Sequence, residues 1–299
     1  MAVAAALLSA APATAADGVV NPAAAYPEGP LVEAGNLYYA EMGRDRVMRW
    51  DGSANRLVWS RRGCGPTSVA PYAGDLVILC HLDGSLVRIT RAGETLATID
   101  RDRSGRGFVN PNAAIADGKG GVYFSSSGQF GPRAPAAGAV LYLDERGGLR
   151  RLAEGIHYAN GVALTADGGT LYVSEHLSRR VLAFDVDADG ALSGRRVYAA
   201  LDDLVGPDEA RGWEVGPDGL AVDGAGNLYV AEYGAGRLLI VGPDRRLLAT
   251  VAVPEPYVTA PALSADDSRL FVTAPVSLHA PEAPGKVYSV ANPIHPAAK

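Results

Sequence analysis

The sequence of 299 residues has no cluster of basic side chains, only two cysteines and no long apolar run after its first residues. With 27 Lys and Arg against 33 Asp and Glu, its formal net charge is −6, and no tract along the chain could neutralise a row of phosphates. Nucleic acid is therefore not expected as a partner. No later stretch reaches the roughly 20 apolar residues that cross a bilayer, so we expect no membrane span.

Residues 1–16 form the one strongly apolar stretch. They combine a short hydrophobic run, a proline, and an Ala-x-Ala arrangement at Ala13 and Ala15, which is typical of an export signal. We therefore expect the mature chain, residues 17–299, to be periplasmic or secreted. No Lys or Arg precedes the apolar run, which leaves a disordered Ala-rich tail as the alternative.

Cys64 and Cys80 flank a predicted hairpin that turns at residues 71–75. An oxidising compartment would allow the two cysteines to form a disulfide, and an antiparallel hairpin would bring them close together. Two unpaired buried thiols are the alternative, because the sequence does not supply the geometry that a disulfide requires.

The 36 glycines and 20 prolines divide the apolar residues into short runs, which favours many strands over long helices. One type of strand recurs six times, about 40 to 57 residues apart, which is the spacing of propeller blades. The copies are residues 36–40, 75–79, 121–125, 170–174, 227–231 and 269–273. We therefore predict an all-β fold, a single six-bladed β-propeller, since a β-helix needs shorter repeats and a sandwich would not give six similar units. Only residues 202–211 suggest a helical turn, and Gly206-Pro207 favours an irregular loop there.

Six residues precede these strands by about ten positions, where the first strand of each blade should begin: Glu28, Pro66, Asn112, Asn160, Asp218 and Pro261. The innermost strands of a propeller line its axis, so these positions converge. Two carboxylates facing each other there would repel unless a cation lay between them. We therefore predict a central metal site made by Glu28, Asn112, Asn160 and Asp218. All-oxygen ligands suit one Ca²⁺ ion best, with Mg²⁺, Mn²⁺ or Zn²⁺ as alternatives.

Asn160-Gly161 and Asp218-Gly219 are also common turn dipeptides. Residues 166–169 and 223–227 already account for the turns of these two blades. We therefore expect Asn160 and Asp218 at the starts of strands.

Four short motifs contain the proposed ligands: Glu28-Gly29-Pro30, Pro111-Asn112, Asn160-Gly161 and Pro217-Asp218-Gly219. With these motifs the chain resembles the SMP-30/gluconolactonase/luciferin-regenerating family over nearly all of its mature length. The resemblance implies a six-bladed propeller, a divalent cation, and hydrolysis of a lactone or another ester-like bond. It makes Glu28, Asn160 and Asp218 metal ligands, and Asn112 a fourth ligand or a substrate contact. One departure is Asn110-Pro111-Asn112-Ala113, where gluconolactonase-type members have Arg-x-Asn-Asp, so a sugar lactone is in doubt.

We therefore expect a metal-dependent lactonase, a carboxylic ester hydrolase, in which the cation polarises the lactone carbonyl and Asp218 acts as general base. Loops on the same face are expected to bind the substrate through Asn112, Asn110, Arg106, Phe130, Tyr158, His176, Trp213 and Tyr233, with Glu175 and His279 as further wall candidates. His81 and His176 follow strand ends, where we read them as loop or channel histidines rather than catalysts. Glu41, Glu175 and Glu232 recur after three of the repeated strands, and we interpret them as blade-packing contacts rather than a second acidic ring.

Two other functions remain open. A non-catalytic propeller would hold a structural Ca²⁺ ion and bind a ligand or a protein on its top face, since a fold does not determine a function. The second is a propeller enzyme of the strictosidine-synthase or phosphotriesterase-like type, although the strictosidine type does not need the four oxygen ligands. We expect a monomer and, for the lactonase, a small-molecule lactone as its partner.

Overall fold

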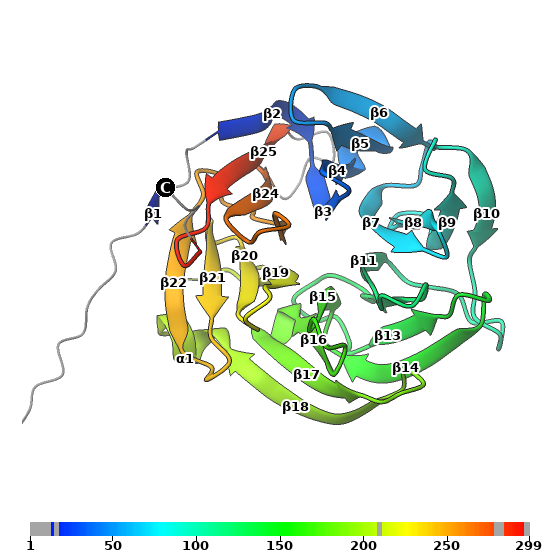
Figure 1. Cartoon of the computed structure of the whole chain (residues 1–299). Coiled ribbons are helices and arrows are strands. Elements are labelled where there is room, and N and C mark those ends of the chain that lie inside the picture. Colours follow the sequence, from blue (N-terminus) through cyan, green and yellow to red (C-terminus); the bar gives the residue numbers. More distant parts are fainter. Residues whose placement is uncertain (1–12, 15–17, 208–210, 278–283, 296–299) are drawn as a thin grey trace, which may run out of the picture.

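A computed structural model describes residues 13–14, 18–207, 211–277 and 284–295, and these form six blades arranged in a ring (Figure 1). The predicted six-bladed β-propeller is therefore confirmed. In each blade, four antiparallel strands follow one another outward from the central channel.

The first three blades each use four consecutive strands. Blade one comprises β3 (Pro27–Glu33), β4 (Asn36–Glu41), β5 (Arg46–Trp50) and β6 (Asn55–Ser60). Blade two comprises β7 (Pro66–Tyr72), β8 (Asp75–Cys80), β9 (Ser85–Ile89) and β10 (Thr95–Ile99). Blade three comprises β11 (Pro111–Ala116), β12 (Val122–Ser126), β13 (Gly138–Leu143) and β14 (Leu149–Ile156).

The last three blades continue the pattern until the ring closes. Blade four comprises β15 (Ala159–Leu164), β16 (Thr170–Glu175), β17 (Arg180–Val186) and β18 (Leu192–Ala200). Blade five comprises β19 (Gly216–Val222), β20 (Leu228–Tyr233), β21 (Arg237–Val241) and β22 (Leu247–Ala252). Blade six comprises β23 (Ala260–Leu263), β24 (Arg269–Pro275), β25 (Pro284–Ala291) and, as its outermost strand, β2 (Gly18–Ala25). The pairing of β2 with β25 ties an N-terminal strand to the last blade and so closes the ring.

The second strand of each blade packs between its neighbours and is buried over nearly its whole length, as in β4, β16 and β20. These strands are therefore near-continuous apolar runs rather than alternating ones. The hydrophobic clusters lie between adjacent blades; one of them joins Tyr229 and Leu238 of blade five to Leu270 and Val272 of blade six. The outermost strand β10, by contrast, is mostly exposed.

The segment predicted to be an irregular loop begins as a short helix, α1 (Leu201–Val205). The prediction was wrong for these residues, where Asp202 and Asp203 lie in the first turn and interact favourably with the helix dipole. Gly206 ends the helix, as the Gly206-Pro207 pair indicated. Two 3₁₀ turns, Met42–Arg44 and His176–Ser178, follow β4 and β16.

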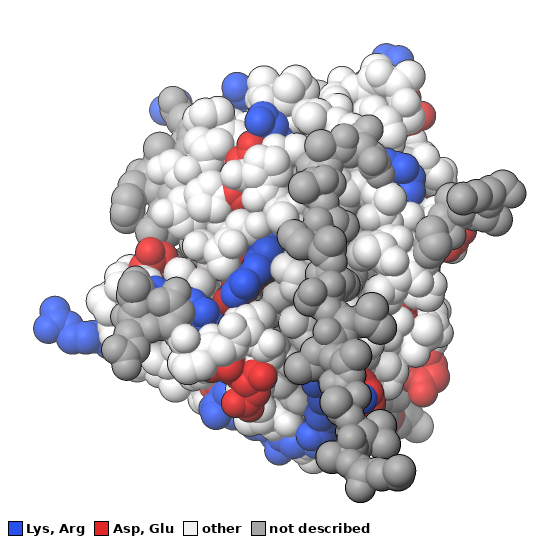
Figure 2. All heavy atoms as spheres, turned by 90° about the vertical axis from the view of Figure 1, so that its left-hand side faces the viewer, with Lys and Arg blue, Asp and Glu red and all other residues white. Residues whose placement is uncertain are grey.

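Most of the predicted export signal lies outside the described residues; within it, only β1 (Ala13–Thr14) is described, and its backbone pairs in parallel with Val251 and Ala252 of β22. His279 also lies outside the described residues. None of the described helices has the length and apolar character needed to cross a membrane. On the side of the ring seen in Figure 2, most of the described surface is uncharged. Acidic and basic side chains are interspersed on it.

Candidate active site

Four buried side chains from four blades point into one cavity of about 220 Å³ at the central channel. Glu28 comes from β3, Asn112 from β11, Asn160 from β15 and Asp218 from β19. Each of these is the innermost strand of its blade. The structure therefore brings together the four oxygen-bearing residues that the repeat places at the axis.

Each of the four residues lies at a β-bulge. In blade five, Pro217 pairs with Glu232 but Leu220 pairs with Val230, so the inner strand has one residue more than its partner. The same extra residue occurs at Glu28, Asn112 and Asn160. A bulge re-aims the side chains beside it, and here it occurs where each ligand candidate faces the channel.

Blade two has the same bulge, and its register corrects the sequence alignment by one residue. Pro66 pairs with Cys80 as Pro217 pairs with Glu232, so Thr67, not Pro66, is the equivalent of Asp218. Thr67 lines the cavity. In blade six, Pro261 pairs with Val272 in a strand without a bulge and does not line the cavity.

Glycine follows three of the ligand candidates because the next blade's backbone passes very close. A Cβ atom at Gly161 would lie under 3.0 Å from the carbonyl oxygen of Asp218, and one at Gly29 would meet that of Thr67. Gly219 is constrained in the same way by Thr259 and Ala260. Asn160-Gly161 and Asp218-Gly219 therefore lie inside strands, as expected, and their glycines permit close packing between blades.

The two carboxyl groups are in an environment that disfavours their charge. Burial raises the pKa of Glu28 well above its usual value, and the nearby Asp218 raises it further. Burial also raises the pKa of Asp218, against hydrogen bonds from the Asn160 side chain and the Gly219 backbone. No Lys or Arg occurs among the described residues that line the cavity. A cation in the cavity would therefore relieve the repulsion between the two carboxylates.

His176 sets the orientation of the Asn160 amide. Its Nε2 donates to the carbonyl oxygen of Glu214 at 2.8 Å, so its Nδ1 is left as an acceptor. Asn160 Nδ2 donates to that Nδ1 at 3.3 Å, which leaves Asn160 Oδ1 buried with no hydrogen-bond partner among the described residues. An orphaned buried acceptor beside two carboxylates is the arrangement that a hard cation satisfies.

The four ligand candidates fit such an ion, although only two of them are carboxylates and none is a histidine. In the described part of the chain, no three His, Cys, Asp or Glu side chains gather into a metal cluster. Two carboxylates and two amide oxygens suit Ca²⁺ or Mg²⁺ better than Zn²⁺, which prefers nitrogen and sulfur ligands.

Two further positions of the repeat build the cavity wall. Tyr26 and Tyr158 each stand two residues before a ligand candidate and have positive φ angles of 45° and 63°. The other position, at the end of the second strand of a blade or directly after it, supplies Met42, His81, His176 and Tyr233. Tyr26, Met42 and Thr67 were not expected in the wall from the sequence. They occupy the same places in the repeat as Tyr158, His176 and Asp218, and the register of the strand pairing reveals this.

Burial is the largest cause of the pKa shifts of the titratable residues in the cavity wall. It lowers the pKa of His81 and of His176 to about 4, so both imidazoles are neutral at pH 7. It raises the pKa of Tyr26, Tyr158 and Tyr233, so all three phenols keep their protons. The hydroxyls of Tyr26 and Tyr233 are hydrogen-bonded to each other at 2.8 Å.

The remaining candidates for substrate binding divide into two groups. Phe130, Tyr158, His176 and Tyr233 line the cavity. Trp213 lies one ring further out, with its centroid 4.9 Å from that of Phe130, and is 45% exposed. Arg106 lies outside the lining, paired with Glu154 at 2.8 Å, and Asn110 donates to the carbonyl oxygen of Gly128.

The three recurring glutamates are packing contacts, as interpreted from the sequence. Each lies at the end of a second strand and pairs with the arginine that begins the third strand: Glu41 with Arg46, Glu175 with Arg180, and Glu232 with Arg237. All three carboxylates are buried and none lines the cavity. They hold the hairpin from which the next wall residue projects.

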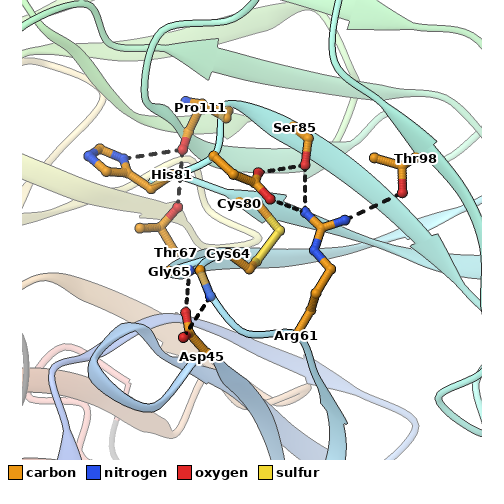
Figure 3. The surroundings of a disulfide bond; sticks show 12 residues. Asp45, Arg61, Cys64, Gly65, Thr67, Cys80, His81, Ser85, Thr98 and Pro111 are labelled. Atoms are coloured by element: carbon orange, nitrogen blue, oxygen red, sulfur yellow. Dashed lines mark hydrogen bonds and ion pairs between the residues drawn. A yellow bond between two sulfur atoms is a disulfide. The ribbon is translucent and has the colours of Figure 1, made fainter.

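In blade two, Cys80 takes the position of these glutamates, since it pairs with Ser85 as Glu232 pairs with Arg237. The structure joins Cys80 to Cys64 in a disulfide, one of the two alternatives that the sequence left open. Figure 3 shows this bond beside His81 and Thr67, two residues of the cavity wall. His81 Nδ1 lies 3.3 Å from the carbonyl oxygen of Pro111, and Thr67 donates to that of Asn112 at 2.8 Å.

A larger cavity, of about 1040 Å³, lies between blades three and four at the other ends of the strands. It is lined by the turns at residues 116–119, 144–146, 164–168 and 186–190, which contain both acidic and basic side chains. It contains none of the four ligand candidates. Size alone therefore does not identify the reactive site, and the smaller cavity has the convergent polar groups that a binding site requires.

Comparisons with known sequences find a family and related proteins. Residues 26–275 match the SMP-30/Gluconolactonase/LRE-like region, a match that covers all four ligand candidates. The pentonolactonase XacC of Haloferax volcanii is 27% identical over 264 residues, which are 85% of this chain and 83% of that protein. The lactonase drp35 of Staphylococcus epidermidis is 28% identical over 195 residues, 63% of this chain and 57% of that protein.

Solved structures give the same fold. A gluconolactonase from Xanthomonas campestris superposes with a TM-score of 0.73 at 25% identity, over 95% of this chain and 99% of that chain. The calcium-binding protein regucalcin from Agrobacterium tumefaciens superposes with a TM-score of 0.74 at 20% identity, over 97% and 99% of the two chains.

Proposed function

Because the chain belongs to the SMP-30/gluconolactonase/LRE-like family, we propose that it is a lactonase that works with one divalent cation at the central cavity. The observation that carries the proposal is the convergence of two buried carboxylates and an unpartnered amide oxygen in a cavity whose described lining has no Lys or Arg. The names of two relatives, a pentonolactonase and the lactonase drp35, support lactone hydrolysis as the reaction.

Glu28, Asn160 and Asp218 would hold the cation, with Asn112 as a fourth ligand or a contact to the substrate. Ca²⁺ is the ion we propose, with Mg²⁺, Mn²⁺ and Zn²⁺ as the alternatives to be tested. When bound, such an ion supplies a Lewis acid for the lactone carbonyl and lowers the pKa of a nearby water.

Asp218 is the proposed general base. Its carboxylate would take a proton from the attacking water while the water oxygen bonds to the carbonyl carbon. The C–O bond of the ring then breaks, and the leaving alkoxide takes up a proton, so one water is consumed and a hydroxy acid is formed. His176 keeps the Asn160 amide oxygen turned toward the cavity throughout, because both of its ring nitrogens are engaged.

We also propose that the chain acts in the periplasm or outside the cell. The apolar leader with its Ala-x-Ala pattern and the Cys64–Cys80 disulfide support this location, since disulfides persist in oxidising compartments. Fractionation of expressing cells, with sequencing of the mature N-terminus, tests it; a cytoplasmic protein that retains residues 1–16 would refute it.

The test of the function is hydrolysis of γ- and δ-lactones by protein stripped with EDTA, with Ca²⁺, Mg²⁺, Mn²⁺ or Zn²⁺ added back. Turnover that depends on the ion and is abolished in Asp218→Ala would support the metallo-lactonase. The regucalcin likeness keeps a second candidate open, a non-catalytic propeller with a structural Ca²⁺ ion. Tight Ca²⁺ binding without turnover of any lactone would favour that second function.

A further inference from the structure

The wall of the central cavity is mainly aromatic, whereas the four ligand candidates within it are polar. Beyond the four ligand candidates, its described lining consists of six aromatic rings or imidazoles at Tyr26, His81, Phe130, Tyr158, His176 and Tyr233, together with Met42 and Thr67. The described lining therefore has no Lys or Arg to bind an anionic or polyhydroxylated substrate.

Most polar groups of the wall already make a hydrogen bond within the protein, and among the described contacts the Nε2 atom of His81 is the exception. Tyr26 and Tyr233 bond to each other, and Thr67 donates to the backbone of blade three. Both nitrogens of His176 have partners. A ring with several hydroxyls would consequently give up its hydrogen bonds to water for a wall that offers mainly ring faces and few free polar groups, which is unfavourable.

An apolar path leads out of the cavity. The ring of Phe130 lies 4.8 Å from that of Tyr158 inside the cavity and 4.9 Å from that of Trp213 outside it. Trp213 then borders a second cavity of about 320 Å³, whose lining also includes Gly131 and Pro132, the next residues after Phe130. Arg179 and Arg211 line this second cavity too, and both are ion-paired with Asp202. The inner cavity is smaller than the roughly 300–1,000 Å³ typical of pockets for drug-sized ligands, so a substituent on a bound ring would extend along this path.

From these contacts, and given the lactonase function proposed above, we infer that the substrate is a lactone with an aryl or alkyl substituent. The lactone ring occupies the inner cavity, and its substituent packs on Phe130 and extends toward Trp213. This class differs from the sugar lactone in the name of the Haloferax volcanii relative. The difference follows from the third blade, where Asn110 turns back to its own loop and no arginine reaches the cavity.

Three δ-lactones test the inference with the metal-loaded protein: one unsubstituted, one with a phenyl substituent, and one polyhydroxylated. Each kcat/KM is divided by the rate constant of the same lactone with hydroxide, so that intrinsic reactivity cancels. We expect the normalised value for the phenyl lactone to exceed that for the polyhydroxylated lactone by about 100-fold or more, because the wall offers ring faces to the phenyl group and few free partners to the hydroxyls. Equal or faster turnover of the polyhydroxylated lactone would overturn the inference while leaving the lactonase intact. Turnover of none of the three would instead count against the proposed function.

Two variants test whether the substituent packs on Phe130: Phe130→Ala and Phe130→Leu. Phe130→Ala should lower the kcat/KM for the phenyl lactone at least about 10-fold more than that for the unsubstituted one, and Phe130→Leu should restore part of the loss, because it returns apolar bulk without the ring. Leu57→Ala, at an exposed site on the outer strand β6, is the control for a general effect of losing an apolar side chain. Equal losses on both lactones in Phe130→Ala would show that the substituent does not lie there.

Discussion

Blades five and two have the same backbone register at the central channel but different side chains at the position that faces the cavity. In both, a proline pairs with a residue near the end of the second strand, Pro217 with Glu232 and Pro66 with Cys80. The next residue faces the cavity, and it is Asp218 in blade five but Thr67 in blade two. The hairpin behind it is held by the ion pair of Glu232 with Arg237 in one blade and by the Cys64–Cys80 disulfide in the other.

The comparison separates two tasks of each blade. The bulge and the hairpin contact place a backbone position at the axis, and different covalent or ionic links can do so. The side chain at that position decides whether the blade contributes a ligand. Glu28, Asn160 and Asp218 are followed by glycine, whereas Thr67 is followed by Ser68, so the close approach between blades is also confined to some of the interfaces.

The largest expected effect comes from the side chain itself. Asp218→Asn should lower kcat on a lactone by about 10² to 10⁴, because a proposed general base is lost without a change of shape. Thr67→Val, at the equivalent position of blade two, should stay within about tenfold of the original protein. Comparable losses in the two variants, measured by steady-state kinetics with saturating metal, would mean that Asp218 has no special role.

The next largest effects are expected on the free energy of unfolding, when either of the two hairpin links is removed. Glu232→Gln should lower the free energy of unfolding by about 3 kcal/mol, because it leaves Arg237 and Arg179 facing a buried neutral group. The double variant Cys64→Ser/Cys80→Ser should cost a similar amount, about 3 kcal/mol, since the disulfide closes a loop of 16 residues. Denaturation in urea measures both, with the exposed Glu145→Gln as a control expected to change little. A loss near zero for Glu232→Gln would show that the ion pair does not stabilise the hairpin.

A smaller effect is expected from the contact between blades. Gly161→Ala places a Cβ atom against the backbone of Asp218 and should destabilise the fold by about 1 to 3 kcal/mol. It should also weaken Ca²⁺ binding, since the strand that carries Asp218 must shift. Gly18→Ala is the matched control, because a Cβ there meets only an ordinary contact at 3.9 Å. Calorimetric titration measures the affinity for Ca²⁺, and thermal unfolding measures the stability. Equal affinity and equal stability of the two variants would mean that the close approach is unimportant.

At neutral pH the smallest effect is expected for the wall histidine of blade two, whose contribution to stability changes only on acidification. Burial lowers the pKa of His81 to about 4 from its usual 6.5, so the folded state binds the proton less tightly than the unfolded state. Its contribution to stability is present above pH 6.5 and is lost as the pH falls toward 4, with a slope of up to about 1.4 kcal/mol per pH unit. The raised pKa values of Glu28 and Asp218 act in the opposite direction, so the difference between the original protein and His81→Gln is the useful quantity. Urea denaturation from pH 4.5 to 7 should show a shallower acid loss in His81→Gln, and parallel curves would contradict the assignment.

Much of the fold was predictable because its signals are local. The six copies of the second strand have the same pattern of β-branched and aromatic residues after a turn, and each forms the strand expected of it. The four oxygen-bearing residues could be found because a repeat places equivalent positions on one axis. The helix Leu201–Val205 could not, because five residues before a Gly-Pro pair have no clear period.

By itself the sequence determined the number of blades, their second strands and the four polar residues at the channel, since these depend on spacing along the chain. Only the tertiary structure decided that Thr67 and not Pro66 faces the cavity, that Met42 and Tyr26 belong to its wall, and that Asn160 turns its oxygen inward. Each of these depends on a register shift of one residue or on a contact between blades. Residues such as Asn160 and Glu214 are far apart in sequence, so no local pattern could set how they meet through His176.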